Sequence, residues 1–180
     1  MEMNINWQEN SKAGIEMKQE TYIKISDFVR KYPNGESIVK HVNLIMTQIV
    51  YVAYFILLIV LAIQKDNRIW RIVLVTGISF LLVSVFRHIV DAPRPYVVYD
   101  FRPVVLKDKK GQSMPSRHVF STFVIGMSFF YVCPFVGGLL FLDGILMCFG
   151  RVIAGVHFPR DVIAGAVVGI LSGILGFYFI

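Results

Sequence analysis

Charged residues are scarce in this chain of 180 residues, where Asp, Glu, Lys and Arg together make up 17% of the sequence. An average soluble domain contains about 25% charged and about 45–50% apolar residues. Here hydrophobic residues reach 56%, and many of them gather in long runs. The composition argues against an ordinary soluble domain and predicts an integral membrane protein.

Cysteine is also rare, with Cys133 and Cys148 as the only two. They are expected near opposite ends of neighbouring spans, so a disulfide between them is not predicted. The first 40 residues contain no apolar core of the kind that a cleavable signal peptide needs. The first membrane span is therefore expected to direct insertion itself.

No basic stripe interleaved with aromatic residues is present, although the net charge is +6. Such a stripe is the usual mark of a nucleic-acid-binding surface, so no nucleic-acid partner is predicted. Several arginines instead lie in or beside apolar segments. The expected partners are the membrane and a lipid phosphate substrate in the bilayer, and the sequence indicates no oligomeric state.

Five apolar segments are candidate membrane spans, since a bilayer core of about 30 Å needs about 20 helical residues. They are predicted at residues 42–63, 69–86, 116–131, 135–149 and 161–180. The expected fold is an all-α integral membrane helical bundle of about five transmembrane helices plus an N-terminal amphipathic helix. In the last segment, glycines repeat at three- or four-residue spacing and are predicted to form a packing surface.

The polar N-terminal part divides into two pieces. Residues 1–17 show no clear period and are predicted to be flexible. Residues 18–40 are predicted to form an amphipathic interfacial helix, which ends at Pro33-Asn34-Gly35, and a linker. This helix either has no functional role or gates the access of substrate. Residues 41–180 are expected to form the membrane-embedded domain.

Three polar clusters lie at the ends of the predicted spans, at Arg87–Pro95, Pro115–His118 and Gly150–Asp161. Charges beside membrane spans are costly, and their recurrence indicates a functional site. Because successive spans cross the membrane in opposite directions, the span count places all three clusters on one face. Between the first two clusters, Lys107–Lys110 are predicted to form an exposed charged tip.

Four arginines are the main source of positive charge in these clusters: Arg87, Arg94, Arg117 and Arg151. On one face they would repel one another, and a phosphate or diphosphate would relieve the repulsion through bidentate hydrogen bonds. Ser116 and the free N–H groups at the start of its helix would add to the anion site. Interaction with lipid headgroups is the alternative for any single arginine.

The histidines suggest catalysis. Asp161 follows His157 by four residues and could accept a hydrogen bond from one ring nitrogen, which leaves the other nitrogen free to attack. His118 would act as a general acid, because histidine titrates near neutral pH. A zinc site made by these three residues is the alternative, but the surrounding cations disfavour it, and no metal or other cofactor is predicted.

The order and spacing of these residues resemble the three-part phosphatase signature of the type 2 phosphatidic acid phosphatases, which the vanadium-dependent haloperoxidases share. The matching residues are Arg87-x6-Arg94-Pro95, Pro115-Ser116-Arg117-His118 and Arg151-x5-His157-x3-Asp161, and the resemblance covers about residues 42–180. It implies that the arginines of the first and third parts bind the phosphoryl oxygens. Ser116 and the backbone N–H of Arg117 would complete the phosphate site.

The same resemblance implies the catalytic roles. His157 would attack phosphorus and form a phosphohistidine, and Asp161 would orient it. His118 would protonate the leaving oxygen and then help to activate water. In this scheme catalysis is positioning and electrostatic stabilisation, without a metal.

The chain departs from the family pattern at three positions. Arg87 stands where lysine is usual and keeps the charge. Arg117 stands where glycine is usual and adds a long cation beside the phosphate site. Gly150 stands where serine is usual, so one hydroxyl donor is lost. These differences bear on substrate choice more than on the class of reaction.

The resemblance therefore implies a metal-independent membrane phosphatase over residues 41–180. Undecaprenyl or another polyprenyl diphosphate is the first substrate expected, with phosphatidic acid or phosphatidylglycerol phosphate next. A lipid phosphotransferase and a non-enzymatic lipid-phosphate-binding or transport protein are the alternatives. The protein is expected to be a multi-pass protein of the cell membrane. Its site is expected on the extracytoplasmic face, because Lys65, Arg68 and Arg71 lie at a turn on the opposite face.

Overall fold

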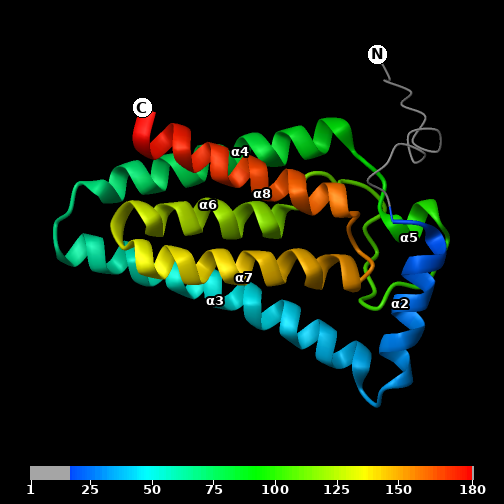
Figure 1. Cartoon of the computed structure of the whole chain (residues 1–180). Helices are drawn as coiled ribbons and strands as arrows, with labels where there is room; N and C mark the ends of the chain where they lie inside the picture. The colour runs from blue at the N-terminus through cyan, green and yellow to red at the C-terminus, as the bar shows by residue number, and fades with distance from the viewer. Residues whose placement is uncertain (1–16, 180) are drawn as a thin grey trace.

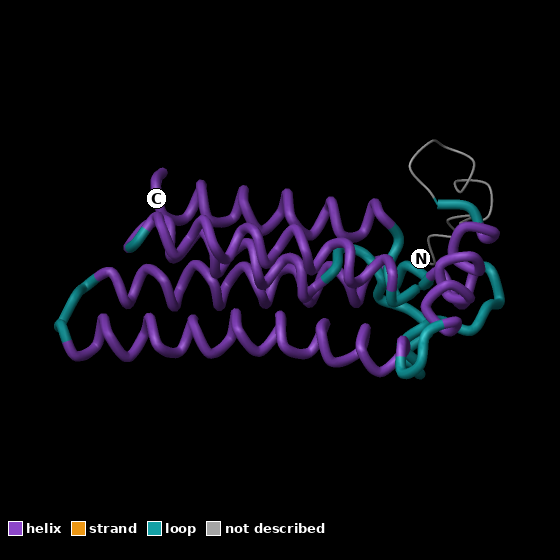
Figure 2. The backbone as a smooth tube through the Cα atoms, turned by 60° about the horizontal axis from the view of Figure 1, so that its bottom comes forward, coloured by secondary structure: helices purple, strands orange, loops and turns teal. Residues whose placement is uncertain are grey.

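The computed structural model describes residues 17–179, and that part of the chain contains helices and no strand. The helices are α2 (Gln19–Lys31), α3 (Gly35–Ile63), α4 (Arg68–Val90), α5 (Pro95–Val98), α6 (Arg117–Val132), α7 (Pro134–Ile153) and α8 (Pro159–Ile174), which continues into the π-helical turn η1 (Leu175–Phe179). Figures 1 and 2 show the five long helices side by side, with α2 and α5 gathered at one end. The predicted all-α bundle is confirmed. Residues 1–17 were predicted to be flexible, and residues 1–16 of that segment lie outside the described part of the chain.

Each predicted span corresponds to one long helix. Four segments are long and apolar enough to cross a membrane: α3, α4 together with α5, α7, and α8 together with η1. Helix α6 has 16 residues and lies at the centre of the bundle, with a run of buried residues from Val119 to Phe129. The bundle therefore contains four candidate spans and the shorter, enclosed helix α6, where about five spans were predicted. Helix α3 begins at Gly35, earlier than predicted, directly after Asn34 in the left-handed conformation.

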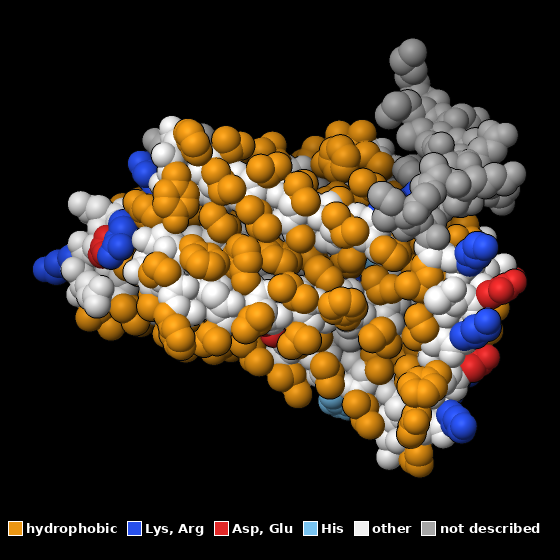
Figure 3. Space-filling model, in the orientation of Figure 1, with side chains coloured by type: hydrophobic (Ala, Val, Ile, Leu, Met, Phe, Trp, Pro, Cys, Tyr) orange, Lys and Arg blue, Asp and Glu red, His pale blue; other side chains and the backbone are white. Residues whose placement is uncertain are grey.

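The outer surface of the bundle is apolar. Figure 3 shows hydrophobic side chains covering the sides of the long helices, while charged side chains gather at the two ends. Large side chains such as Ile63 and Phe135 are each 77% exposed, which suits contact with lipid tails rather than water. The chain is a multi-pass membrane protein.

Helices α6 and α8 pack closely because α8 presents glycines to α6. A Cβ atom on Gly165 would lie 2.7 Å from the Ser116 carbonyl oxygen, and one on Gly169 would lie 2.8 Å from the Phe120 carbonyl oxygen. The predicted packing surface thus faces α6. The close contact joins the starts of the two helices, where the Ser116 N–H donates to Asp161 O at 2.8 Å. In this way the second and third polar clusters are brought together.

Helix α2 lies across the end of the bundle that carries the polar clusters (Figure 1). Its Tyr22 is 1% exposed and stacks on Phe101 with a distance of 5.3 Å between ring centroids. The Tyr22 hydroxyl donates to the backbone carbonyl of His157 at 3.1 Å. On another face of the helix, Phe28 and Tyr32 are exposed. The amphipathic helix is therefore packed on the bundle beside the polar clusters.

Candidate active site

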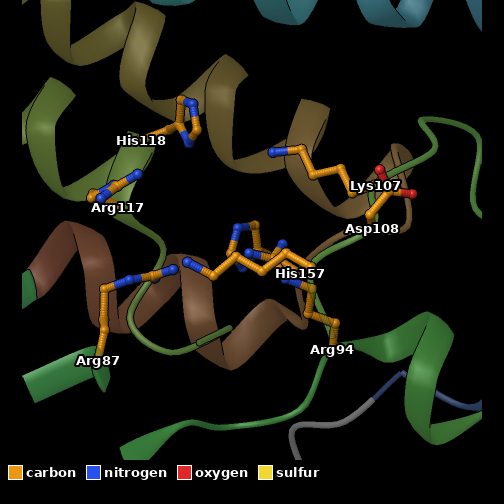
Figure 4. Close-up of a pocket in the computed structure, with 8 residues that line it drawn as sticks. Arg87, Arg94, Lys107, Asp108, Arg117, His118 and His157 are labelled. Atoms are coloured by element: carbon orange, nitrogen blue, oxygen red, sulfur yellow. The ribbon is translucent and has the colours of Figure 1, made fainter. Parts of the chain in front are cut away.

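A cavity of about 430 Å³ opens at the end of the bundle where α2 and α5 lie, and Figure 4 shows its lining. The residues that line it are Arg87, Arg94, Lys107, Asp108, Lys109, Arg117, His118 and His157. Members of all three sequence clusters therefore face one space. Five of these eight side chains are cations and one is a carboxylate, so the cavity is suited to an anion.

Two arginines of the cavity are held in place by backbone carbonyl groups. Arg87, at the end of α4, donates to Ser113 O at 3.2 Å and also to the carbonyls of Gln112 and Pro115. This surrounds its guanidinium with the segment that leads into α6. In the part of the chain that is described, no carboxylate lies within salt-bridge distance of Arg87. Its charge is therefore oriented but not neutralised by the protein.

Arg94 lies at the start of α5 and is held in the same way. Its Nε donates to Gly111 O and one terminal nitrogen donates to Val156 O, both at 3.1 Å. It too has no carboxylate within salt-bridge distance among residues 17–179. Fixed donors of this kind need little reorganisation when an anion binds.

Arg151 and Ser116 are two further residues that were predicted to bind phosphate. Both are buried, at the last turn of α7 and at the N-cap of α6, and neither lines the cavity. The Arg151 Nε and the Ser116 hydroxyl have no hydrogen-bond partner among residues 17–179. The backbone N–H of Ser116 is taken by Asp161, so it is not free for an anion. The phosphate-binding roles of both residues remain predictions.

His157 and Asp161 meet through a third residue, Ser113. The distance from His157 Nδ1 to Asp161 Oδ2 is 3.5 Å. The Ser113 hydroxyl donates to Asp161 Oδ2 at 2.5 Å and lies 3.3 Å from His157 Nδ1. Because the hydroxyl proton is given to the carboxylate, the hydroxyl oxygen can accept from Nδ1–H. This arrangement leaves the lone pair on Nε2.

Asp161 is fixed by its own helix as well. The Phe158 N–H donates to Asp161 Oδ2 at 3.0 Å, where α8 begins. The carboxylate thus caps the helix and accepts from Ser113 at the same time. Sequence analysis did not single out Ser113, and its only signal was its place two residues before Pro115.

Burial governs the protonation of His157, which lies in the connection between α7 and α8. Desolvation lowers the pKa of His157 to about 4, and the positive charges of Arg94 and Arg151 act in the same direction. The hydrogen bond and charge of Asp161 oppose this shift without cancelling it. The imidazole is therefore neutral at physiological pH, as a nucleophile must be.

Arg117 and His118 open helix α6 and face the same cavity (Figure 4). The Arg117 guanidinium carbon lies 5.6 Å from the centroid of the Phe80 ring, a cation–π contact across to α4. Figure 4 shows the His118 ring across the cavity from His157. Within the described residues, His, Cys, Asp and Glu side chains form no group of three that could hold a metal ion.

Lys107 departs from the predicted exposed tip. The Val105 N–H donates to Ala154 O at 3.2 Å, which ties this part of the α5–α6 connection to the α7–α8 connection. Leu106 then points outward, and Lys107 turns inward and lines the cavity. Lys110 is exposed, as predicted. The anchored connection therefore turns Lys107 inward, and it adds two cations, Lys107 and the more exposed Lys109, to the lining of the cavity.

Comparisons with known proteins agree on one family. The model described as the PAP2 superfamily matches residues 68–180. Undecaprenyl-diphosphatase BcrC of Bacillus subtilis (strain 168) is 26% identical over 147 residues, which cover 79% of this chain and 76% of that protein.

Two solved structures have the same fold. The crystal structure of Aquifex aeolicus LpxE matches with a TM-score of 0.69 and 26% identity, over 89% of this chain and 94% of that chain. The first transmembrane PAP2 type phosphatidylglycerolphosphate phosphatase from Bacillus subtilis matches with a TM-score of 0.65 and 22% identity, over 88% of this chain and 83% of that chain.

Proposed function

This chain belongs to the PAP2 superfamily, and from that membership we propose that it is a membrane phosphatase that hydrolyses a lipid diphosphate through a phosphohistidine. The family resemblance drawn from the three-part signature is confirmed. The observation that carries the mechanism is the buried His157–Ser113–Asp161 network beside a cavity lined with cations.

The cavity supports binding of the terminal phosphate. Arg87 and Arg94 are oriented by carbonyl groups and keep their charge available. Arg151 is buried, and its charge interacts with that of Arg94, so that it adds to the positive potential. Donors that are already oriented toward the phosphoryl oxygens stabilise the charge of the transition state without reorganisation. The proposed anion site consists of these three arginines, with Ser116 and Arg117 at its edge.

The nucleophile in this proposal is His157 Nε2, with Nδ1–H held by Ser113 and Asp161. Attack on phosphorus breaks the bond to the leaving oxygen, and His118 gives that oxygen a proton. His118 then takes a proton from water, which attacks the phosphohistidine and releases phosphate. Each step uses side chains of this chain only, and no metal is required.

The proposed substrate is a polyprenyl diphosphate. The similarity to undecaprenyl-diphosphatase BcrC supports this choice, as does the excess of cations over what one phosphate needs. The apolar sides of α4 and α8 would hold the tail in the bilayer. We place the cavity on the extracytoplasmic face, because the turn between α3 and α4 at the other end carries Lys65 and Arg68.

The direct test is release of phosphate in detergent from undecaprenyl diphosphate, phosphatidic acid and phosphatidylglycerol phosphate. His157→Ala should lower release by a factor of at least about 10³, because the covalent step is lost. His41→Ala is the matched control, since His41 is exposed at the N-terminal part of α3. A wild-type protein that releases no phosphate, or a His157→Ala variant that keeps its activity, would contradict the proposal.

A further inference from the structure

Lys107 is a cation of the cavity that the mechanism above does not use. It is half-buried in the α5–α6 connection, whereas its neighbour Leu106 is 67% exposed. Figure 4 shows the Lys107 ammonium group directed toward the space between His118 and His157. Its side chain is therefore directed toward the place where the leaving group of the reaction would lie.

Lys107 and Arg117 differ from the other cations of the cavity in their contacts. Arg87 and Arg94 are held by backbone carbonyl groups, and Lys109 Nζ donates to Gln112 Oε1 at 2.6 Å. Lys107 and Arg117 form no hydrogen bond or ion pair with any residue from 17 to 179, and Arg117 only stacks on the Phe80 ring. Their N–H groups are therefore available to a ligand.

Holding Lys107 in this position is unfavourable for the protein alone. Desolvation and the positive charges of Arg151, Arg94, Arg117 and Arg87 together lower the pKa of Lys107 to about 8. A lysine without a ligand to bind would usually extend its ammonium group into water. An anion bound between Lys107 and the arginines would neutralise the repulsion among their charges, and its oxygens would accept the hydrogen bonds that water otherwise accepts from the ammonium group.

We propose that Lys107 and Arg117 form a second anion subsite, which binds the leaving-group phosphate of a diphosphate lipid. The inference rests on the proposed function and assigns the preference for a diphosphate over a monophosphate to two named side chains. Figure 4 shows the two cations approaching the His118 side of the cavity from different directions. The cavity volume of about 430 Å³ leaves room for two linked phosphate groups.

The subsite acts on the bond that breaks. When His157 Nε2 attacks the terminal phosphorus, the bond from that phosphorus to the bridging oxygen breaks, and the bridging oxygen keeps the electron pair. His118 supplies the proton to that oxygen. Lys107 and Arg117 stabilise the negative charge of the departing lipid monophosphate, and water then releases inorganic phosphate from His157. A lipid monophosphate has no group at this subsite.

The test compares farnesyl diphosphate with farnesyl monophosphate, which differ only in the second phosphate. Lys107→Gln should lower the ratio of kcat/KM for the diphosphate to kcat/KM for the monophosphate by about tenfold or more, because one charge-assisted hydrogen bond is lost. Lys107→Arg should restore most of the ratio. Lys110→Gln is the matched control, since Lys110 is exposed and does not line the cavity.

The outcomes separate this inference from the proposed function. Wild-type protein that hydrolyses neither lipid overturns the proposed function. Wild-type protein that hydrolyses both, with the same ratio in Lys107→Gln as in wild type, overturns the second subsite alone. A variant that elutes as a single species in size exclusion and retains monophosphate hydrolysis is folded, so misfolding cannot explain a change in the ratio. Arg117→Gln should change the ratio in the same direction.

Discussion

Ser113 links the two residues on which the proposed mechanism depends. Its hydroxyl lies 2.5 Å from Asp161 Oδ2 and 3.3 Å from His157 Nδ1. A hydroxyl in this place fixes both the tautomer and the orientation of the imidazole. Ser113 is a positioning residue in this view, because it reaches the reacting atoms only through His157.

Replacement of Ser113 by alanine tests that role. We expect kcat to fall roughly 10- to 100-fold, since a nucleophile out of alignment loses about that much, while KM changes little. Steady-state kinetics on farnesyl diphosphate give both constants. Ser128→Ala is the control, because Ser128 is an equally buried serine whose hydroxyl bonds to Val124 O inside α6. A change confined to KM, or an equal loss of kcat in both variants, would argue against the positioning role.

The protonation of Lys107 makes a second prediction at the residue scale. Its pKa of about 8 lies below the ordinary value, so the ammonium form dominates below pH 8 and is lost above it. The preference for diphosphate over monophosphate should therefore decline as pH rises through about 8, since kcat/KM reports the free enzyme. The arginines around Lys107 keep their protons near pH 8, and His157, with a pKa of about 4, titrates well below this pH.

The measurement is the ratio of the two kcat/KM values from pH 6 to 10. In Lys107→Arg the decline should move above pH 10, because arginine keeps its proton there. His118, Asp108 and Lys109 also face the cavity, but they are unchanged in this variant, so a shift between the two profiles comes from position 107. Identical profiles in wild type and Lys107→Arg would exclude Lys107 as the titrating group.

At the scale of elements, the contact between α6 and α8 holds the site together, because the two helices deliver His118 and Asp161. A Cβ atom on Gly169 would lie 2.8 Å from Phe120 O and 2.9 Å from Phe123 Cβ. Both distances are too short, and one partner is a backbone atom that cannot move alone. The helices must separate to admit even one methyl group.

We therefore expect Gly169→Ala to lower the free energy of unfolding by about 1–3 kcal/mol, a typical cost of overpacking. Thermal unfolding in detergent should show a Tm several degrees lower. Gly138→Ala is the control, because nothing lies within 4 Å of a Cβ atom there and alanine favours helix over glycine. An equal decrease in Tm in both variants would mean that the close contact of Gly169 with α6 does not decide the result.

At the scale of the whole molecule, the two ends of the bundle differ in what they carry. Helices α2 and α5 lie at one end, and the α3–α4 and α6–α7 turns lie at the other (Figure 1). The cavity is at the end with α2 and α5. An exposed cysteine, Cys133, stands at the α6–α7 turn. Labelling of its thiol therefore shows on which side of the membrane the end opposite the cavity lies, and no introduced cysteine is needed.

A membrane-impermeant maleimide tests the proposed orientation in intact cells. Cys133 should react only after lysis, because the proposed site faces outward and the α6–α7 turn faces inward. Lys110→Cys, in a background with Cys133→Ser, should react before lysis. Reversed labelling of the two positions would place the cavity on the cytoplasmic face.

Sequence patterns predicted the features that depend on local composition, on the number of membrane spans or on the spacing of residues along the chain. Lengths of apolar segments predicted the long helices, and the alternation of spans predicted that the three clusters share one face. The glycine repeat predicted the packing surface of α8, since only small residues allow such close approach. Each of these follows from a period or a count along the chain.

The features that were missed depend on distant parts of the chain. The sequence by itself determined a helical membrane protein with arginines, histidines and a carboxylate at one membrane face, because hydropathy and spacing carry that information. The tertiary structure alone decided that Ser113 bridges His157 and Asp161, that Ser116 is buried, and that Lys107 turns into the cavity. The physical reason is that irregular connections take their course from long-range hydrogen bonds, such as the one from Val105 to Ala154, which no local pattern records.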